Sequence, residues 1–158
     1  MSGENRTVVM SSVMLPAQAN PHGNIHGGEV MKLMDSTAGC AAVKYCRHMV
    51  VTARVDEVQF LRPIHVGDFL TITARVVYVG TTSMEVYVTV DVENLRQQDS
   101  TVRALDAYFT IVAIGDDERP VPVPPYVPET EEDIALWHDV QARRDDAKAR
   151  REAKLRRT

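Results

Sequence analysis

Long apolar runs are absent from this sequence of 158 residues. No stretch supplies the roughly 18 consecutive apolar residues that a membrane-spanning helix needs. The first residues also lack the basic and apolar regions of a secretory signal. With 44% hydrophobic and 25% charged residues, the composition is typical of a globular protein. We therefore expect a soluble, cytoplasmic protein that binds no membrane.

The sequence also has few cysteines and no net positive charge. Cys40 and Cys46 lie six residues apart, a spacing that does not place them side by side on a helix, so we expect two buried free thiols. The formal net charge of −4 argues against a nucleic-acid partner. The basic end of the chain, from Arg143, is interpreted as a solvated helix end or an oligomer contact.

A metal-binding pattern is missing as well. His22 and His26 are four residues apart, but Pro21 and Gly23 are incompatible with a helix that would bring them together. No carboxylate or thiol completes a ligand set around them. We therefore predict that the protein binds no metal.

Apolar residues recur at helical spacing between Gly28 and Cys46. The stripe consists of Val30, Met31, Met34, Ala38, Ala41, Ala42 and Tyr45. A polar, glycine-rich loop over residues 17–28 precedes it. This pattern predicts one long helix with a single buried face.

The apolar period changes to two elsewhere in the chain, which indicates strands. The predicted strands are 8–15, 50–60, 69–79, 85–92 and 102–114. In the fourth of them, Glu85, Tyr87, Thr89 and Asp91 share one face while valines occupy the other, as expected for a sheet with one wet face. We expect these strands to follow one another in an antiparallel meander.

This order of elements predicts an α+β fold, in which a five-stranded antiparallel sheet wraps around one long central helix. One such unit seldom covers both faces of its sheet, so we expect a dimer. The predicted divisions are a domain over 7–115, a Pro-rich extended linker over 116–130 and a charged C-terminal helix over 131–158. The Thr130 side chain is expected to cap that helix.

A carboxylate, Asp35, borders the apolar stripe of the long helix. The helix opens at Gly27 and Gly28, where unpaired backbone N–H groups and the positive end of the helix dipole can polarise a carbonyl oxygen. Helical geometry alone leaves a second interpretation open, in which Asp35 is solvated or paired with a neighbour such as Lys32.

Several ordered segments together resemble the acyl-CoA hydrolase branch of the hotdog-fold thioesterases, which includes cytosolic brain-type and short bacterial enzymes. The segments are 16–28, 31–35, 51–56, 67–68, 82–84, 107–110, 122–124 and 127–131. The likeness covers nearly the whole chain. It implies a hotdog fold and an acyl-CoA thioesterase that releases fatty acid and CoA, with no cofactor beyond the CoA of the substrate and product.

The resemblance also implies which residues carry the reaction. Asp35 and Asn20 match the two catalytic positions of the family, which different protomers contribute to one site. Asp35 is the general base or, alternatively, the nucleophile, Asn20 positions the reacting group, and the N–H of Gly28 stabilises the oxyanion. Taken alone, Asn20 is also a common turn residue before Pro21.

Further positions match those that hold the substrate in the family. They are His26, Gly27, Ala53, Arg54, Val55, Thr82, Ser83, Met84 and Arg103. His26 is expected to cap the helix or line the site, with a role as catalytic base as the other option. Arg54 and Arg103 are the candidates for the CoA phosphates. Arg62, Arg75 and Arg96 are the alternatives for that role.

The resemblance further implies a homo-oligomer in which hotdog dimers assemble as a trimer of dimers. Two other functions compete with hydrolysis. One is a noncatalytic acyl-CoA-binding module, and the other is a hotdog hydratase or dehydratase, for which only His26 offers a candidate base. Because the chain keeps both Asn20 and Asp35, we favour the enzyme. The sequence leaves the acyl chain length open.

Overall fold

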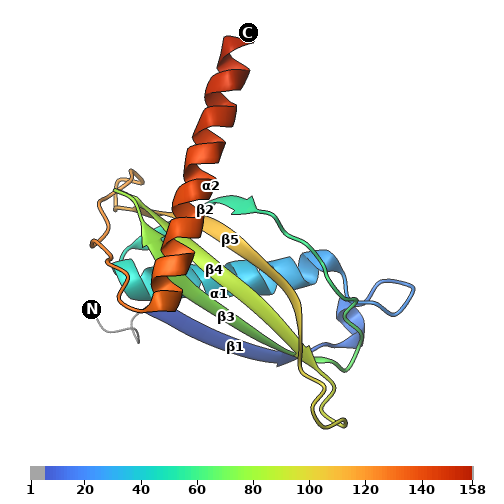
Figure 1. Ribbon diagram of the computed structural model, residues 1–158. Helices are drawn as coiled ribbons and strands as arrows, with labels where there is room; N and C mark the ends of the chain where they lie inside the picture. Colours follow the sequence, from blue (N-terminus) through green and yellow to red (C-terminus); the bar gives the residue numbers. More distant parts are fainter. Residues whose placement is uncertain (1–5, 158) are drawn as a thin grey trace.

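A computed structural model describes residues 6–157, and within them the chain forms five strands, two α-helices and one short 3-10 helix (Figure 1). In chain order they are β1 (Thr7–Val13), η2 (Pro16–Gln18), α1 (Gly27–Cys46), β2 (Met49–Asp56), β3 (Phe69–Val79), β4 (Ser83–Glu93), β5 (Val102–Ile114) and α2 (Glu131–Arg156).

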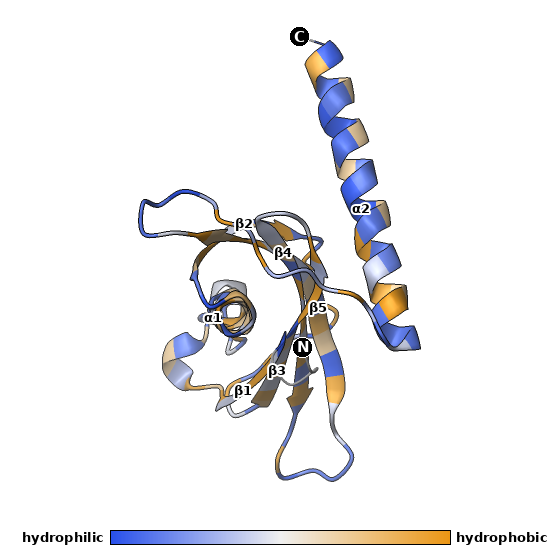
Figure 2. Cartoon of the chain, turned by 90° about the vertical axis from the view of Figure 1, so that its left-hand side faces the viewer, coloured by the Kyte–Doolittle hydropathy of each residue, from blue (hydrophilic) through white to orange (hydrophobic). Residues whose placement is uncertain are grey.

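The five strands form one antiparallel sheet in the order β1-β3-β4-β5-β2. The sheet curves around α1, which Figure 2 shows nearly end-on inside the curve. The predicted hotdog fold is thereby confirmed. The predicted meander is correct only for β3, β4 and β5. Residues 57–68 carry the chain from β2 at one edge to β3, which lies next to β1 near the other.

The buried face of α1 follows the predicted apolar stripe. Six of its seven residues are buried, and Met31 is half-buried against the core. Thr37 joins them because its hydroxyl donates to the Leu33 carbonyl oxygen at 2.7 Å, which satisfies the polar group inside the core. Cys46 is buried as expected, but Cys40 is exposed, because it points away from the stripe two residues after Ala38.

The outer face of the sheet departs from the expectation of a wet surface. Glu85 and Thr89 of β4 are both buried there. The cause is α2, which packs on this face through a small cluster of Val77, Tyr108 and Val140. Only the first half of α2 lies against the sheet, and its C-terminal half stands away from the body of the molecule (Figure 1).

The connection from β5 to α2 is fixed by hydrogen bonds between side chains and its backbone. The Tyr45 hydroxyl is within hydrogen-bond distance of the carbonyl oxygens of Pro124 and Pro125, at 2.9 and 3.0 Å. The Thr130 side chain accepts from the N–H of Asp133 at 3.0 Å, which confirms the predicted cap of α2. Among residues 6–157, neither α-helix is apolar enough over sufficient length to cross a membrane.

Candidate active site

The N-terminus of α1 presents two backbone donors. The carbonyl oxygen of His26 accepts from the N–H groups of Glu29 and Val30, at 3.0 and 3.4 Å, which closes the first turn. Within the described residues, the N–H groups of Gly27 and Gly28 donate to no acceptor. They therefore remain available, at the positive end of the helix dipole, to a ligand oxygen. The His26 side chain is exposed and makes no capping hydrogen bond.

A cavity of about 400 Å³ opens beside this helix end. Its walls are Asn20, Asn24, Ile25, Gly27, Val30, Phe60, Leu61, Arg62, Pro63 and Ile64. The lining is largely apolar, with two amides and one guanidinium. Gly27 leaves room for the neighbouring ring, since a Cβ there would lie 3.1 Å from Cζ of Phe60. An acyl group is the kind of ligand that such a cavity can enclose.

The Asn20 side chain is held in place by its own loop. Its Oδ1 accepts from the N–H groups of His22 and Asn24, at 3.0 and 3.2 Å. The turn role suggested by the sequence is therefore present, and it does not exclude a role in the cavity. Among residues 6–157, the Nδ2 of Asn20 has no acceptor, so it can donate to a bound molecule.

Asp35 lies on an exposed part of α1 and is bound to β2. The Thr52 hydroxyl donates to Asp35 Oδ1 at 2.6 Å. No ion pair joins Asp35 to Lys32 in the described part of the chain. Eight residues of helix separate Asp35 from Gly27, which corresponds to about 12 Å along the axis. A single chain therefore does not bring Asp35 into the cavity that Asn20 lines.

A β-bulge in β2 separates the two sides of the predicted substrate segment. Thr52 pairs with Ile111 and Arg54 pairs with Thr110, so Ala53 is the extra residue. Without the bulge, Thr52 and Arg54 would share a face. Instead, Thr52 reaches α1, whereas Arg54 lies beside α2 on the outer face. The bulge thus places Thr52 on the side of the sheet that faces Asp35 and Arg54 on the outer side.

The other predicted substrate residues lie in different places. Thr82 and Ser83 lie at the turn between β3 and β4, and the Thr82 carbonyl oxygen accepts from the N–H of Ala113. Met84 is fully buried in the core, so its side chain offers no surface to a ligand. Val55 of β2 is exposed and pairs with Phe109 of β5.

The two arginines expected at the CoA phosphates do not come together. The Arg54 guanidinium lies 3.4 Å from Asp56. The Nε of Arg103 donates to Asp91 at 2.7 Å, in a separate hollow that Arg75 and Tyr87 also line. Over residues 6–157, no cluster of three or more His, Cys, Asp or Glu is arranged to hold a metal ion.

Comparison with known proteins identifies the family. Residues 22–98 match the model of the thioesterase superfamily. The chain is 39% identical to YkhA, an uncharacterized acyl-CoA thioester hydrolase of Bacillus subtilis. The match extends over 144 residues, which are 91% of this chain and 83% of that protein. It spans about a third of the length of the mammalian cytosolic acyl coenzyme A thioester hydrolases that it matches.

Solved structures extend the likeness to the fold. An apo-hexameric acyl-CoA thioesterase has a TM-score of 0.89 at 35% identity, over 95% of this chain and 96% of that one. The acyl-CoA hydrolase of Staphylococcus aureus, solved with butyryl coenzyme A and coenzyme A, has a TM-score of 0.88 at 32% identity, over 99% and 94% of the two chains.

Three variants of the Staphylococcus aureus enzyme have also been solved, in which an asparagine, an aspartate or a threonine is replaced by alanine. The aspartate lies 15 residues after the asparagine, and the threonine lies 17 residues after the aspartate. Asn20, Asp35 and Thr52 have the same two separations. Thr52 was not among the predicted site residues, although it falls inside the matching segment 51–56. Its hydrogen bond to a helix 17 residues away required the structure. The chain belongs to the acyl-CoA thioester hydrolases of the thioesterase superfamily.

Proposed function

We propose that this protein hydrolyses fatty acyl-CoA to free fatty acid and CoA, with Asp35 of one protomer and Asn20 of its partner acting on one thioester. The observation that carries the proposal is the division of the site within the chain. Asp35 is exposed and held by Thr52, while Asn20 and Gly27 line a cavity about 12 Å farther along α1. A second protomer can supply the missing half to each.

The described residues support a general-base mechanism. The Asp35 carboxylate takes a proton from a water molecule, whose oxygen then attacks the carbonyl carbon of the thioester. The negative charge that develops on the carbonyl oxygen is stabilised by the N–H of Gly28. When the C–S bond breaks, the protonated Asp35 returns its proton to the thiolate of CoA. The Nδ2 of Asn20 orients the water or the carbonyl oxygen.

An exposed apolar edge of the sheet supports a dimer. β2 is an edge strand, and three of its apolar residues, Met49, Val51 and Val55, are exposed. Phe60 and Leu61, beside the cavity, are exposed as well. An apolar edge strand is a liability unless another chain covers it. We therefore propose a homodimer that covers this edge, assembled as a trimer of dimers, since a hexameric thioesterase has the same fold.

Thr52 is assigned as a positioning residue that acts through Asp35. Thr52→Val removes the hydroxyl that donates to the carboxylate, and we expect kcat to fall about 10-fold because one hydrogen bond to a charged group is lost. Thr52→Ser keeps the donor and should stay within about 2-fold of the wild type. If the valine variant retains full kcat, Thr52 does not position Asp35.

Thiol release from a panel of acyl-CoAs of increasing chain length tests the proposal. We expect the wild type to release CoA from at least part of the panel, with KM set by how well each chain fills the cavity beside Phe60. Acyl-CoA binding without thiol release at any chain length would contradict hydrolysis. That result would favour the noncatalytic binding module instead.

A further inference from the structure

The cavity beside the N-terminus of α1 is electropositive. Among the residues described at its walls, Arg62 is a cation, Asn20 and Asn24 are carboxamides, and none is a carboxylate. The positive end of the α1 dipole adds to this charge, because Gly27 lines the same cavity. The chain as a whole has a formal net charge of −4. An anionic group is therefore attracted to this cavity, although the protein as a whole is acidic.

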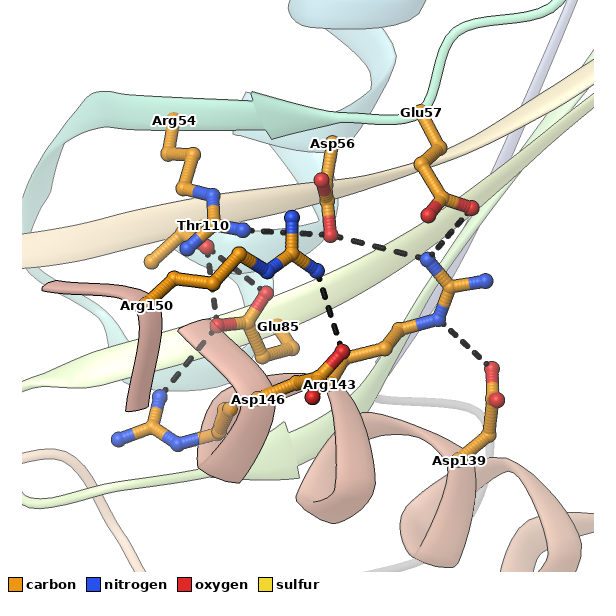
Figure 3. A network of polar contacts seen from close by, with 10 residues as sticks. Arg54, Asp56, Glu57, Glu85, Thr110, Asp139, Arg143, Asp146 and Arg150 are labelled. Atoms are coloured by element: carbon orange, nitrogen blue, oxygen red, sulfur yellow. Dashed lines mark hydrogen bonds and ion pairs between the residues drawn. The ribbon is translucent and has the colours of Figure 1, made fainter. Parts of the chain in front are cut away.

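The guanidinium of Arg62 is not neutralised by a carboxylate. Within residues 6–157 it forms no ion pair and no hydrogen bond. Other arginines of the chain are already paired. Figure 3 shows Arg54, Arg143 and Arg150 in contact with carboxylates of β2 and α2. Arg62 can therefore give all of its N–H donors to a ligand.

The backbone is fixed on both sides of Arg62. The N–H of Leu61 donates to a carbonyl oxygen of β5 at 2.9 Å, and the carbonyl oxygen of Ile64 accepts from the N–H of Ile25 at 2.7 Å. Between these bonds, Pro63 restricts Arg62 to an extended conformation, because its ring clashes with a helical residue before it. The exposed Arg62 is therefore held at the mouth of the cavity.

A second donor lies on the neighbouring segment. Asn24 lines the same cavity, and its backbone forms a β-bridge with His65, which ties its loop to the Arg62 segment. The N–H of Asn24 donates to Asn20, but within residues 6–157 the carboxamide of Asn24 has no partner. Its Nδ2 can therefore donate to an oxygen that Arg62 also binds.

An apolar surface leads from the N-terminus of α1 toward Arg62. The ring of Phe60 lies next to Gly27, since a Cβ there would be 3.1 Å from its Cζ. Phe60 is two residues before Arg62, so their Cα atoms are at most about 7 Å apart. Val30 adds buried apolar surface to the same cavity. An acyl chain whose thioester is held at Gly28 can therefore run over Phe60 and end near Arg62.

We propose that this cavity selects acyl-CoAs whose acyl chain ends in a second carboxylate, with Arg62 and Asn24 binding that carboxylate. The substrate class is the CoA monothioester of a short dicarboxylic acid. The planar fork of a guanidinium matches the two oxygens of a carboxylate, and such charge-assisted hydrogen bonds are stronger than neutral ones. Hydrolysis leaves the second carboxylate unchanged and releases a dicarboxylate and CoA. The inference rests on the proposed thioesterase function and narrows its substrate class.

The test compares two series of thioesters that share the same CoA. The first series is hexanoyl-, octanoyl- and decanoyl-CoA, and the second carries a carboxyl group in place of the terminal methyl group of each. At the best-fitting length, kcat/KM of the wild type should be about 10-fold higher for the carboxylate-ended chain, because that chain adds hydrogen bonds between charged groups. Arg62→Gln, which removes the charge and keeps a polar side chain, should abolish this preference.

The matched control is Arg119→Gln. Arg119 is also exposed and lies outside the cavity, and within residues 6–157 its guanidinium has no partner. Its replacement should leave the preference for the carboxylate-ended chain within about 2-fold of the wild type. High salt should weaken the preference of the wild type, because the charge of the exposed Arg62 is screened.

Three results would overturn the inference. The first is a wild type that shows no preference at any chain length, and the second is a preference that survives Arg62→Gln. The third is an Arg62→Gln variant that loses kcat/KM equally on both series, because Arg62 would then bind the CoA that both series share. Inactivity of the wild type on every substrate would instead contradict the thioesterase proposal itself.

Discussion

Replacing Asp35 with asparagine will lower kcat for acyl-CoA hydrolysis about 10²–10⁴-fold, the range that a positioned general base contributes. Asparagine has the shape of aspartate and can still accept the Thr52 hydrogen bond, but its amide cannot take a proton from water. Because Asp35 is exposed, the substitution should leave the fold intact. Steady-state kinetics, with circular dichroism to verify folding, measure both effects.

A matched control for this prediction is Glu29→Gln, which removes a carboxylate from the first turn of the same helix. It should lower kcat by no more than a few-fold, because Glu29 is not assigned to the reaction. A folded Asp35→Asn variant with wild-type kcat would show that another group acts as the base.

Replacing Gly28 with proline will lower kcat about 10²–10³-fold, because it removes the N–H proposed to stabilise the oxyanion. Proline is tolerated in the first turn of a helix, where the N–H has no partner within the helix. A Cβ on Gly28 meets no atom within 4 Å, so the ring has space on that side. The proline variant should therefore fold while losing one catalytic donor.

The control is Gly28→Ala, which adds a Cβ in the same open space and keeps the N–H. Its kcat should lie within about 3-fold of the wild type, since the donor proposed for the oxyanion is unchanged. Equal activity of the proline and alanine variants would locate the oxyanion donor elsewhere, with the N–H of Gly27 as the next candidate.

The central helix was predictable because its signals are local. The apolar stripe from Val30 to Tyr45 repeats at helical spacing, and the glycines before it mark its start within one residue. Asp35 and Asn20 were assigned from the resemblance, and the separation of Asp35 from Gly27 follows from helix length. Local periodicity therefore determined the helix and the distance from its N-terminus to Asp35, whereas the position of Asn20 depends on the contacts of its loop.

The outer face of the sheet was not predictable from the same signals. Glu85 alternates with valines as a solvent-facing residue does, yet it is buried because α2 packs over it. The contact depends on Val140 meeting Tyr108 across more than 30 residues of chain, which no local pattern reveals.

The bulge in β2 was a second feature beyond the reach of alternation. Period-two patterning assigns Thr52 and Arg54 to one face, whereas the extra residue Ala53 directs them to opposite sides of the sheet. The hydrogen bond from Thr52 to Asp35 depends on this switch. The position of β2 beside β5 likewise followed from long-range pairing.

Mixing two inactive variants tests the shared site most directly. Asp35→Asn and Asn20→Ala should each be nearly inactive alone, because every site in either homodimer lacks one of the two residues. After subunit exchange, about half of the dimers are mixed, and each has one intact site, so activity should recover to about a quarter of the wild type. No recovery, despite exchange verified by mass spectrometry of tagged chains, would contradict a site shared between protomers.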